Sequence, residues 1–176
     1  MRNPPSRWTR ALAAAVCASP LLLTAGCVTE GPKPPPRVTF QEPANPVIEQ
    51  MVMNTHYPRD TDGNGHPDTM DIFVHLFEAD GKYPLSVTAR GTFVFEMSDS
   101  QGKQVGRWVF TPELAAERKH RDRVGPCYLF RVSLLEPGMS DRLSTEYIDL
   151  RGHFVREDGV VVRPSGVISQ YFGRVR

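Results

Sequence analysis

Residues 127–134, Cys127-Tyr128-Leu129-Phe130-Arg131-Val132-Ser133-Leu134, show the clearest alternation in the chain. Large apolar side chains stand at every second position from Tyr128 to Leu134, and the residues between them are both polar and apolar. Successive side chains of a β-strand point to opposite faces, so this period of two predicts a strand with one face in a core.

Similar short runs occur on both sides of this segment and are separated by turn residues. The expected strands include residues 47–57, 70–77, 93–97, 108–110, 148–154, 160–162 and 167–175. The segments 98–102, 157–159 and 163–166 are rich in Asp, Ser, Pro and Gly, which favour tight turns between neighbouring strands. The sequence therefore predicts an all-β fold, an antiparallel, immunoglobulin-like β-sandwich of about seven to eight strands.

One short connecting helix is expected within this pattern. Thr111 is a suitable N-cap, Pro112 fits the first helical position, and Glu113 follows in the first turn. The helix is predicted to run to about Arg121, as a solvated connector between strands.

Composition limits the classes of partner. The chain has 176 residues, 21 basic and 20 acidic side chains, and a net charge of +1. Nucleic-acid binders normally carry a basic excess, so no nucleic-acid partner is expected. The three cysteines cannot form a dense disulfide scaffold, and the length suits one domain.

The first 27 residues have the features of an export signal. Three arginines precede an apolar run over residues 11–25, which is too short to span a bilayer comfortably. The run ends in Ala25-Gly26-Cys27, which resembles the lipobox of bacterial lipoproteins. The resemblance implies cleavage before Cys27 and lipidation of its thiol. It also implies an exported, membrane-anchored protein of the cell envelope, in the outer membrane if the cell has two membranes, because Val28 follows instead of aspartate.

The predicted organisation is then a signal peptide over residues 1–26 and a lipidated Cys27 with a tether over residues 27–45. A β-sandwich domain over residues 46–176 follows. The consecutive prolines of the tether favour polyproline II, a semi-rigid spacer. An ordinary signal peptide with a free Cys27 is the alternative.

Residues 60–71, Asp60-Thr61-Asp62-Gly63-Asn64-Gly65-His66-Pro67-Asp68-Thr69-Met70-Asp71, carry the one motif with evident chemistry. The spacing resembles the calcium loops of EF-hands, dockerins and thrombospondin type 3 repeats. Calcium takes six to eight oxygen ligands, which alternate residues of a tight loop can supply. The resemblance implies six ligands, His66 through its backbone carbonyl: Asp60, Asp62, Asn64, His66, Asp68 and Asp71.

The flanks of this loop predict a strand–loop–strand arrangement instead of helix–loop–helix. The ion is expected to have a structural role. A polar turn without metal is the alternative. The Cys and His spacing does not indicate a structural zinc site. His75 is expected to be a satisfied histidine at the edge of the core, and Cys127 a packed, inert thiol instead of a nucleophile paired with His120 or His153.

These features predict a non-enzymatic, lipid-anchored envelope protein that acts as a binding or structural module, with a protein or glycan as its partner. Two alternatives remain from the sequence. A carbohydrate-binding module requires Trp108, Tyr83 or Tyr171 to be exposed together on one sheet face. A calcium-dependent extracellular hydrolase requires the loop aspartates to act with His66 or His75 beside a substrate.

Overall fold

The computed structural model describes residue 31 and residues 40–79 and 83–173. The predicted signal peptide, Cys27 and most of the predicted tether lie outside the described residues. The chain divides into the units Met1–Arg37 and Val38–Arg176, and the fold below is that of the second unit. Among the described residues, no helix combines the length and the apolar character that crossing a membrane requires.

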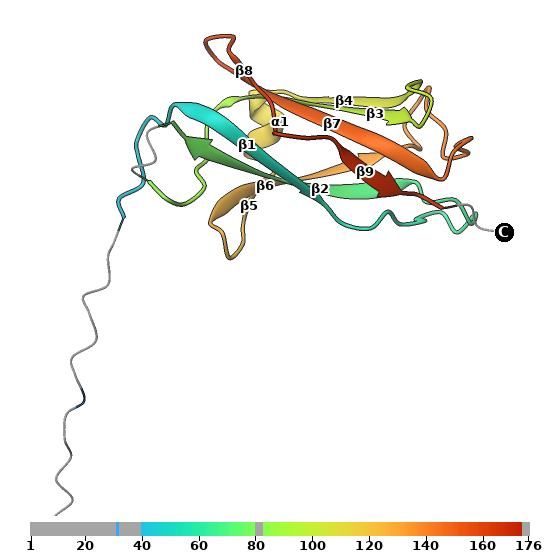
Figure 1. The fold of residues 1–176 in the computed structure, drawn as a ribbon, viewed down its shortest axis with the longest axis horizontal. Coiled ribbons are helices and arrows are strands. Elements are labelled where there is room, and N and C mark those ends of the chain that lie inside the picture. Colours follow the sequence, from blue (N-terminus) through green and yellow to red (C-terminus); the bar gives the residue numbers. More distant parts are fainter. Residues whose placement is uncertain (1–30, 32–39, 80–82, 174–176) are drawn as a thin grey trace, which may run out of the picture. The chain divides into compact units, whose positions relative to one another are not determined.

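The second unit is an all-β sandwich of two antiparallel sheets, as the sequence predicts (Figure 1). Sheet A has the strand order β1-β2-β6-β5, and sheet B has the order β4-β3-β7-β8, with β9 also paired to β7. The elements are β1 (Ile48–Thr55), β2 (Thr69–Glu78), β3 (Gly91–Asp99), β4 (Gln104–Phe110), α1 (Pro112–Ala116), β5 (Lys119–Arg121), β6 (Pro126–Ser133), β7 (Tyr147–Arg156), β8 (Val161–Val162) and β9 (Ile168–Tyr171).

The two-residue period places one face of each central strand in the core. On β2 the buried apolar residues are Met70, Ile72, Val74 and Leu76. The antiparallel register sets Ile72 opposite Phe130 of β6, so the apolar faces of the two strands coincide. A slip of one residue would turn these faces to the outside, and burial therefore specifies the register.

Aromatic rings join the two sheets. The ring centroid of Phe130 on β6 lies 4.8 Å from that of Phe93 and 5.1 Å from that of Phe95, both on β3. Phe110 of β4 approaches Phe130 to 4.6 Å. Phe130 is fully buried. Such tilted aromatic pairs contribute beyond the area that they bury, which makes Phe130 the centre of the contact between the sheets.

The turns form where Asp and Gly residues were expected to place them. Asp99 accepts hydrogen bonds from the backbone N–H groups of Gln101 (3.0 Å) and Lys103 (2.8 Å), which closes the turn from β3 to β4. Gly159, with φ of 84°, closes the turn from β7 to β8 through a bond to the carbonyl of Arg156 (2.9 Å). Glycine reaches this left-handed region without steric cost.

The connecting helix is shorter than predicted. It begins as expected, with Thr111 as N-cap and Pro112 in the first turn, but it ends at Ala116. Lys119–Arg121 instead forms β5, a strand of sheet A paired with β6. The backbone groups of Lys119–Arg121 therefore pair with β6 across the sheet instead of continuing the helix, and the sequence pattern did not indicate this strand.

Replacing Phe130 with alanine should remove the ring that both sheets share. We expect Phe130→Ala to lower the free energy of unfolding by about 3–5 kcal/mol, the usual cost of a large cavity in a core. Urea titration followed by circular dichroism measures this. Leu135→Ala, at a side chain that is 48% exposed, is the control and should change the stability by less than about 1 kcal/mol. Equal losses in the two variants would contradict the central role of Phe130.

Candidate metal loop and its arginine clamp

The predicted calcium loop connects β1 and β2, so the expected strand–loop–strand arrangement is confirmed. Backbone hydrogen bonds close its base: Arg59 N–H donates to the carbonyl of Thr69 (2.8 Å), and the N–H groups of Asp68 and Thr69 donate to the carbonyl of Arg59 (2.9 and 3.0 Å). Residues 60–67 therefore project as a loop from a closed base.

The Asp60 carboxylate organises the first half of the loop. It accepts backbone hydrogen bonds from Gly63 (2.7 Å) and Gly65 (2.7 Å). Both glycines have positive φ, 75° and 87°, which lets the chain wrap around the carboxylate. The bond from Gly65 is the main reason why the pKa of Asp60 is lowered, and Asp60 is therefore ionised at neutral pH.

Asp62 and Asn64 continue the wrapped chain. Asp62 accepts from the backbone N–H of Asn64 (3.1 Å) and from its side-chain amide (2.9 Å). The amide oxygen of Asn64 accepts from the backbone N–H of His66 (2.8 Å). Asn64 also donates to Asp141 (2.6 Å), which lies in the connection from β6 to β7. Asp141 is a neighbour that sequence reasoning missed, because it is remote in the chain and stands in no motif.

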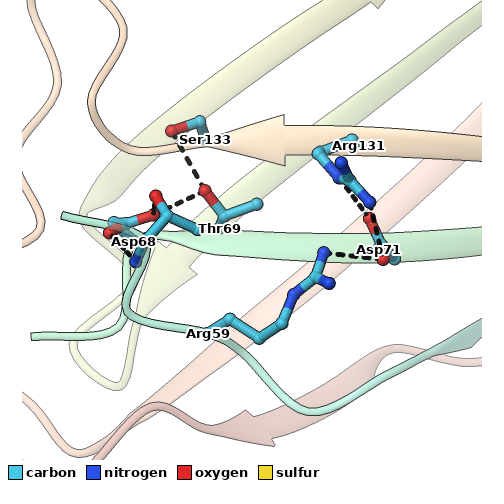
Figure 2. A network of polar contacts seen from close by, with 7 residues as sticks. Arg59, Asp68, Thr69, Asp71, Arg131 and Ser133 are labelled. Carbon is cyan, nitrogen blue, oxygen red and sulfur yellow. Dashed lines mark hydrogen bonds and ion pairs between the residues drawn. The ribbon is translucent and has the colours of Figure 1, made fainter. Parts of the chain in front are cut away.

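Asp68 lies at the base of the loop and is almost fully buried (1% exposed). It accepts from the backbone N–H (2.7 Å) and the hydroxyl (2.6 Å) of Thr61, and from the hydroxyl of Thr69 (Figure 2). Burial acts to raise the pKa of Asp68, but the bonds from Thr61 and Thr69 outweigh it and the pKa is lowered. The carbonyl of Asp68 accepts from Leu134 (2.7 Å), which ties the loop to the end of β6.

The loop brings together three of the six predicted ligands. One carboxylate oxygen each from Asp60, Asp62 and Asp68 lie within 4.8 Å of one another. Oxygens that share a calcium ion at 2.3–2.6 Å can be separated by up to about 5 Å, so this donor set fits the ion. Asn64 and His66 lie in the same loop, where the amide oxygen of Asn64 accepts a hydrogen bond from the backbone N–H of His66. Asp60, Asp62 and Asn64 are exposed to solvent.

The sixth predicted ligand, Asp71, has other partners. It lies on β2 opposite Arg131 of β6, and Arg131 donates to both of its oxygens (2.8 and 3.3 Å). Arg59 donates to it from the base of the loop (2.8 Å), as Figure 2 shows. Asp71 comes three residues after Asp68 along an extended strand, a span of about 10 Å, so an aspartate there does not reach back to the loop as the predicted bidentate ligand would.

We call Arg59, Asp71 and Arg131 the arginine clamp. The Asp71 side chain is 11% exposed, and the hydrogen bond from Arg131 is the main cause that lowers its pKa. The clamp joins the base of the loop, β2 and β6 through one buried charge. Its role is therefore to hold the loop against sheet A.

The two histidines of the hydrolase alternative lie apart, with His66 in the loop and His75 on β2. Asp60 and Asp62 lie in the exposed part of the loop and Asp68 at its buried base, whereas His75 is buried on β2 (5% exposed) and hydrogen-bonded to Asp122, as expected for a satisfied histidine. Cys127 is also buried, and burial raises the pKa of its thiol, which disfavours a nucleophilic thiolate. Of the two histidines considered with Cys127, His153 lies on β7 in the other sheet, whereas His120 lies on β5 opposite Cys127.

The aromatic residues of the carbohydrate-binding alternative do not form one exposed platform. Trp108 is buried and donates to Glu136 (3.1 Å), and Tyr83 is half-buried. Tyr171 is exposed on β9, where its partner is Tyr147 of β7, with ring centroids 5.2 Å apart.

Comparison with known proteins finds no protein family, no curated protein and no solved structure that matches this chain.

The arginine clamp predicts a pH-dependent contribution to stability. We expect Asp71→Asn to lower the free energy of unfolding at neutral pH by about 1–3 kcal/mol, because two arginines lose their carboxylate. The folded-state pKa lies below the ordinary value of 3.8, so this contribution is present above that pH and is lost as the pH falls through the lowered pKa. Urea titrations at neutral and acid pH should therefore show that the free energies of unfolding of the wild type and of Asp71→Asn become equal in acid.

The matched control is Glu96→Gln, which removes an exposed carboxylate paired with Arg107. Because exposed ion pairs contribute little to stability, we expect Glu96→Gln to change the free energy of unfolding by no more than about 0.5 kcal/mol. A loss for Asp71→Asn that is no greater than that of Glu96→Gln would contradict the clamp.

Proposed function

We propose that this protein is a lipid-anchored component of the bacterial cell envelope, and that its β-sandwich is a non-enzymatic binding or structural module with a calcium-stabilised loop. The observation that carries the proposal is the convergence of the Asp60, Asp62 and Asp68 carboxylates in the loop between β1 and β2. Negative charges at this separation repel one another, and a cation between the three carboxylates would replace that repulsion with attraction.

Calcium in this loop would be structural. The three carboxylates offer a hard, anionic oxygen set, which suits calcium better than softer metals. Asp68 couples the loop to β6 through Thr69, whose hydroxyl contacts Ser133 (3.4 Å). Ion binding would therefore order the exposed tip on a base that the arginine clamp already holds. An ordered tip is suited to recognition of a protein or glycan partner in the envelope.

The proposal of a lipid anchor is based on the sequence around Cys27. Stable attachment to a bilayer needs two hydrophobic signals, because a single acyl chain binds only marginally. A diacylglyceryl group on the thiol with a further acyl chain on the amine meets that requirement. The proline-rich tether would then hold the sandwich away from the lipid surface.

Calcium should raise the melting temperature of the purified full-length protein. For a weak site with a dissociation constant of about 10⁻⁴ M, about 10 mM calcium adds about 2.7 kcal/mol of stability and raises the melting temperature by about 5 °C or more. Asp62→Asn should remove most of this increase, because it deletes one exposed ligand charge. Differential scanning calorimetry with calcium or with a chelator measures both effects.

Glu96→Gln, on β3 of sheet B, is the control and should keep the full calcium response. The calcium loop would be ruled out by a wild-type melting temperature that is the same in calcium and in chelator. A response of equal size in Asp62→Asn would have the same consequence.

The lipid anchor is tested separately at Cys27. In a diderm bacterial host fed with labelled palmitate, we expect the wild-type protein to carry the label and to sediment with membranes. Cys27→Ser should carry no label and should leave the membrane fraction. Cys17→Ser, which changes the other N-terminal cysteine, should behave as wild type. Equal labelling of Cys27→Ser would contradict anchoring at this residue.

A further inference from the structure

A second group of possible metal ligands lies on the outer face of sheet A. Because the core residues of β2 have even numbers, His75 points away from the core, and so does Cys127 on β6. The register pairs Val74 with Tyr128, which makes His75 and Cys127 neighbours across the two strands. Both are nevertheless buried, His75 at 5% and Cys127 at 0% exposure.

Asp122 completes the group from the turn between β5 and β6. One of its oxygens accepts from the backbone N–H groups of Val124 (2.8 Å) and Gly125 (3.2 Å), which fixes the turn. The other oxygen faces His75 and lies 2.9 Å from its Nε2 atom. The Asp122 side chain is 32% exposed, so the group is open to solvent on one side.

The three donor atoms are close enough to share one ion. A ring nitrogen of His75, the sulfur of Cys127 and a carboxylate oxygen of Asp122 all lie within 4.8 Å of one another. Ligands of a tetrahedral zinc ion, with bonds of about 2.0–2.3 Å, are separated by about 3.3–3.8 Å. Small rotations of these side chains would bring them to that spacing.

Their chemistry favours a borderline-soft divalent ion. Thiolate and imidazole ligands select zinc-class metals, whereas calcium and magnesium prefer an all-oxygen shell. A thiolate and a carboxylate carry two negative charges and imidazole is neutral, so a divalent cation would leave no net charge at this largely buried position. Burying a neutral site costs less free energy than burying an unpaired charge.

We propose that His75, Asp122 and Cys127, brought together by β2, β6 and the turn between β5 and β6, bind a zinc-class metal ion with a fourth position open to solvent. On binding, the thiol of Cys127 loses its proton to solvent, and its sulfur lone pair forms the metal bond. His75 binds through a ring nitrogen in the neutral form, and Asp122 binds through the oxygen that now faces His75. The open position is filled by water.

Cobalt(II) is the probe for this site, because it adopts zinc-like geometry and its thiolate complexes absorb in the near ultraviolet. The full-length chain, reduced and freed of metal with a chelator, is titrated with Co²⁺. We expect a thiolate-to-cobalt band that saturates at one ion per chain and disappears when Zn²⁺ is added. Zn²⁺ should also raise the melting temperature.

Three variants test the ligands, with circular dichroism as the check on folding. Cys127→Ser should abolish the band. Asp122→Asn, at a partly exposed turn, should keep the fold and weaken cobalt binding at least about tenfold, since it removes a charged ligand. His75→Gln should weaken binding similarly.

The controls separate this site from the other thiols and from the calcium loop. The double variant Cys17→Ser with Cys27→Ser leaves Cys127 as the remaining thiol and should keep the band. Asp62→Asn should keep it as well. The proposal is overturned if wild type gives no band, if Cys127→Ser retains it, or if Asp122→Asn and His75→Gln bind cobalt as tightly as wild type.

Discussion

The packing of Phe130 against the rings of Phe93 and Phe95 is the interaction on which the rest of the structure depends. It joins sheet A to sheet B and, because alternate residues of a strand face opposite ways, it also specifies the register of β6. The outer face of sheet A follows from that register. Arg131 meets Asp71 and Cys127 stands beside His75 because Phe130 faces inward. One core contact thus positions both the arginine clamp and the buried group of possible metal ligands.

The loop between β1 and β2 combines a base that is fastened to the sheet with a solvent-exposed tip. Backbone bonds between Arg59 and Thr69 close the base, and the arginine clamp and Asp68 fasten it to β6. Asp60 and Asp62 lie beyond this base and are exposed to solvent. This separation explains how a loop of high negative charge is compatible with a tightly packed sandwich.

The two proposed metal sites differ in how the chain builds them. The proposed calcium loop takes its hard oxygen ligands from one contiguous segment, with Asp60 and Asp62 exposed and Asp68 buried at the base. The zinc-class site takes His75, Asp122 and Cys127 from separate elements and buries the softer donors. Sequence spacing indicates the first kind of site directly. The second kind has no signature along the chain, which is why the spacing of Cys and His residues did not indicate it.

The sequence by itself determined the sandwich class, its main strands and turns, the N-cap at Thr111 and the strand–loop–strand setting of residues 60–71. These features depend on local backbone preference and on a two-residue period, which can be read from neighbouring residues. Only the tertiary structure decided that 119–121 is a strand, that Asp71 binds two arginines, that Asp141 reaches Asn64, and that His75 and Cys127 are buried side by side. Each of these depends on which strand lies beside which and in what register, and packing between residues remote in the chain sets both.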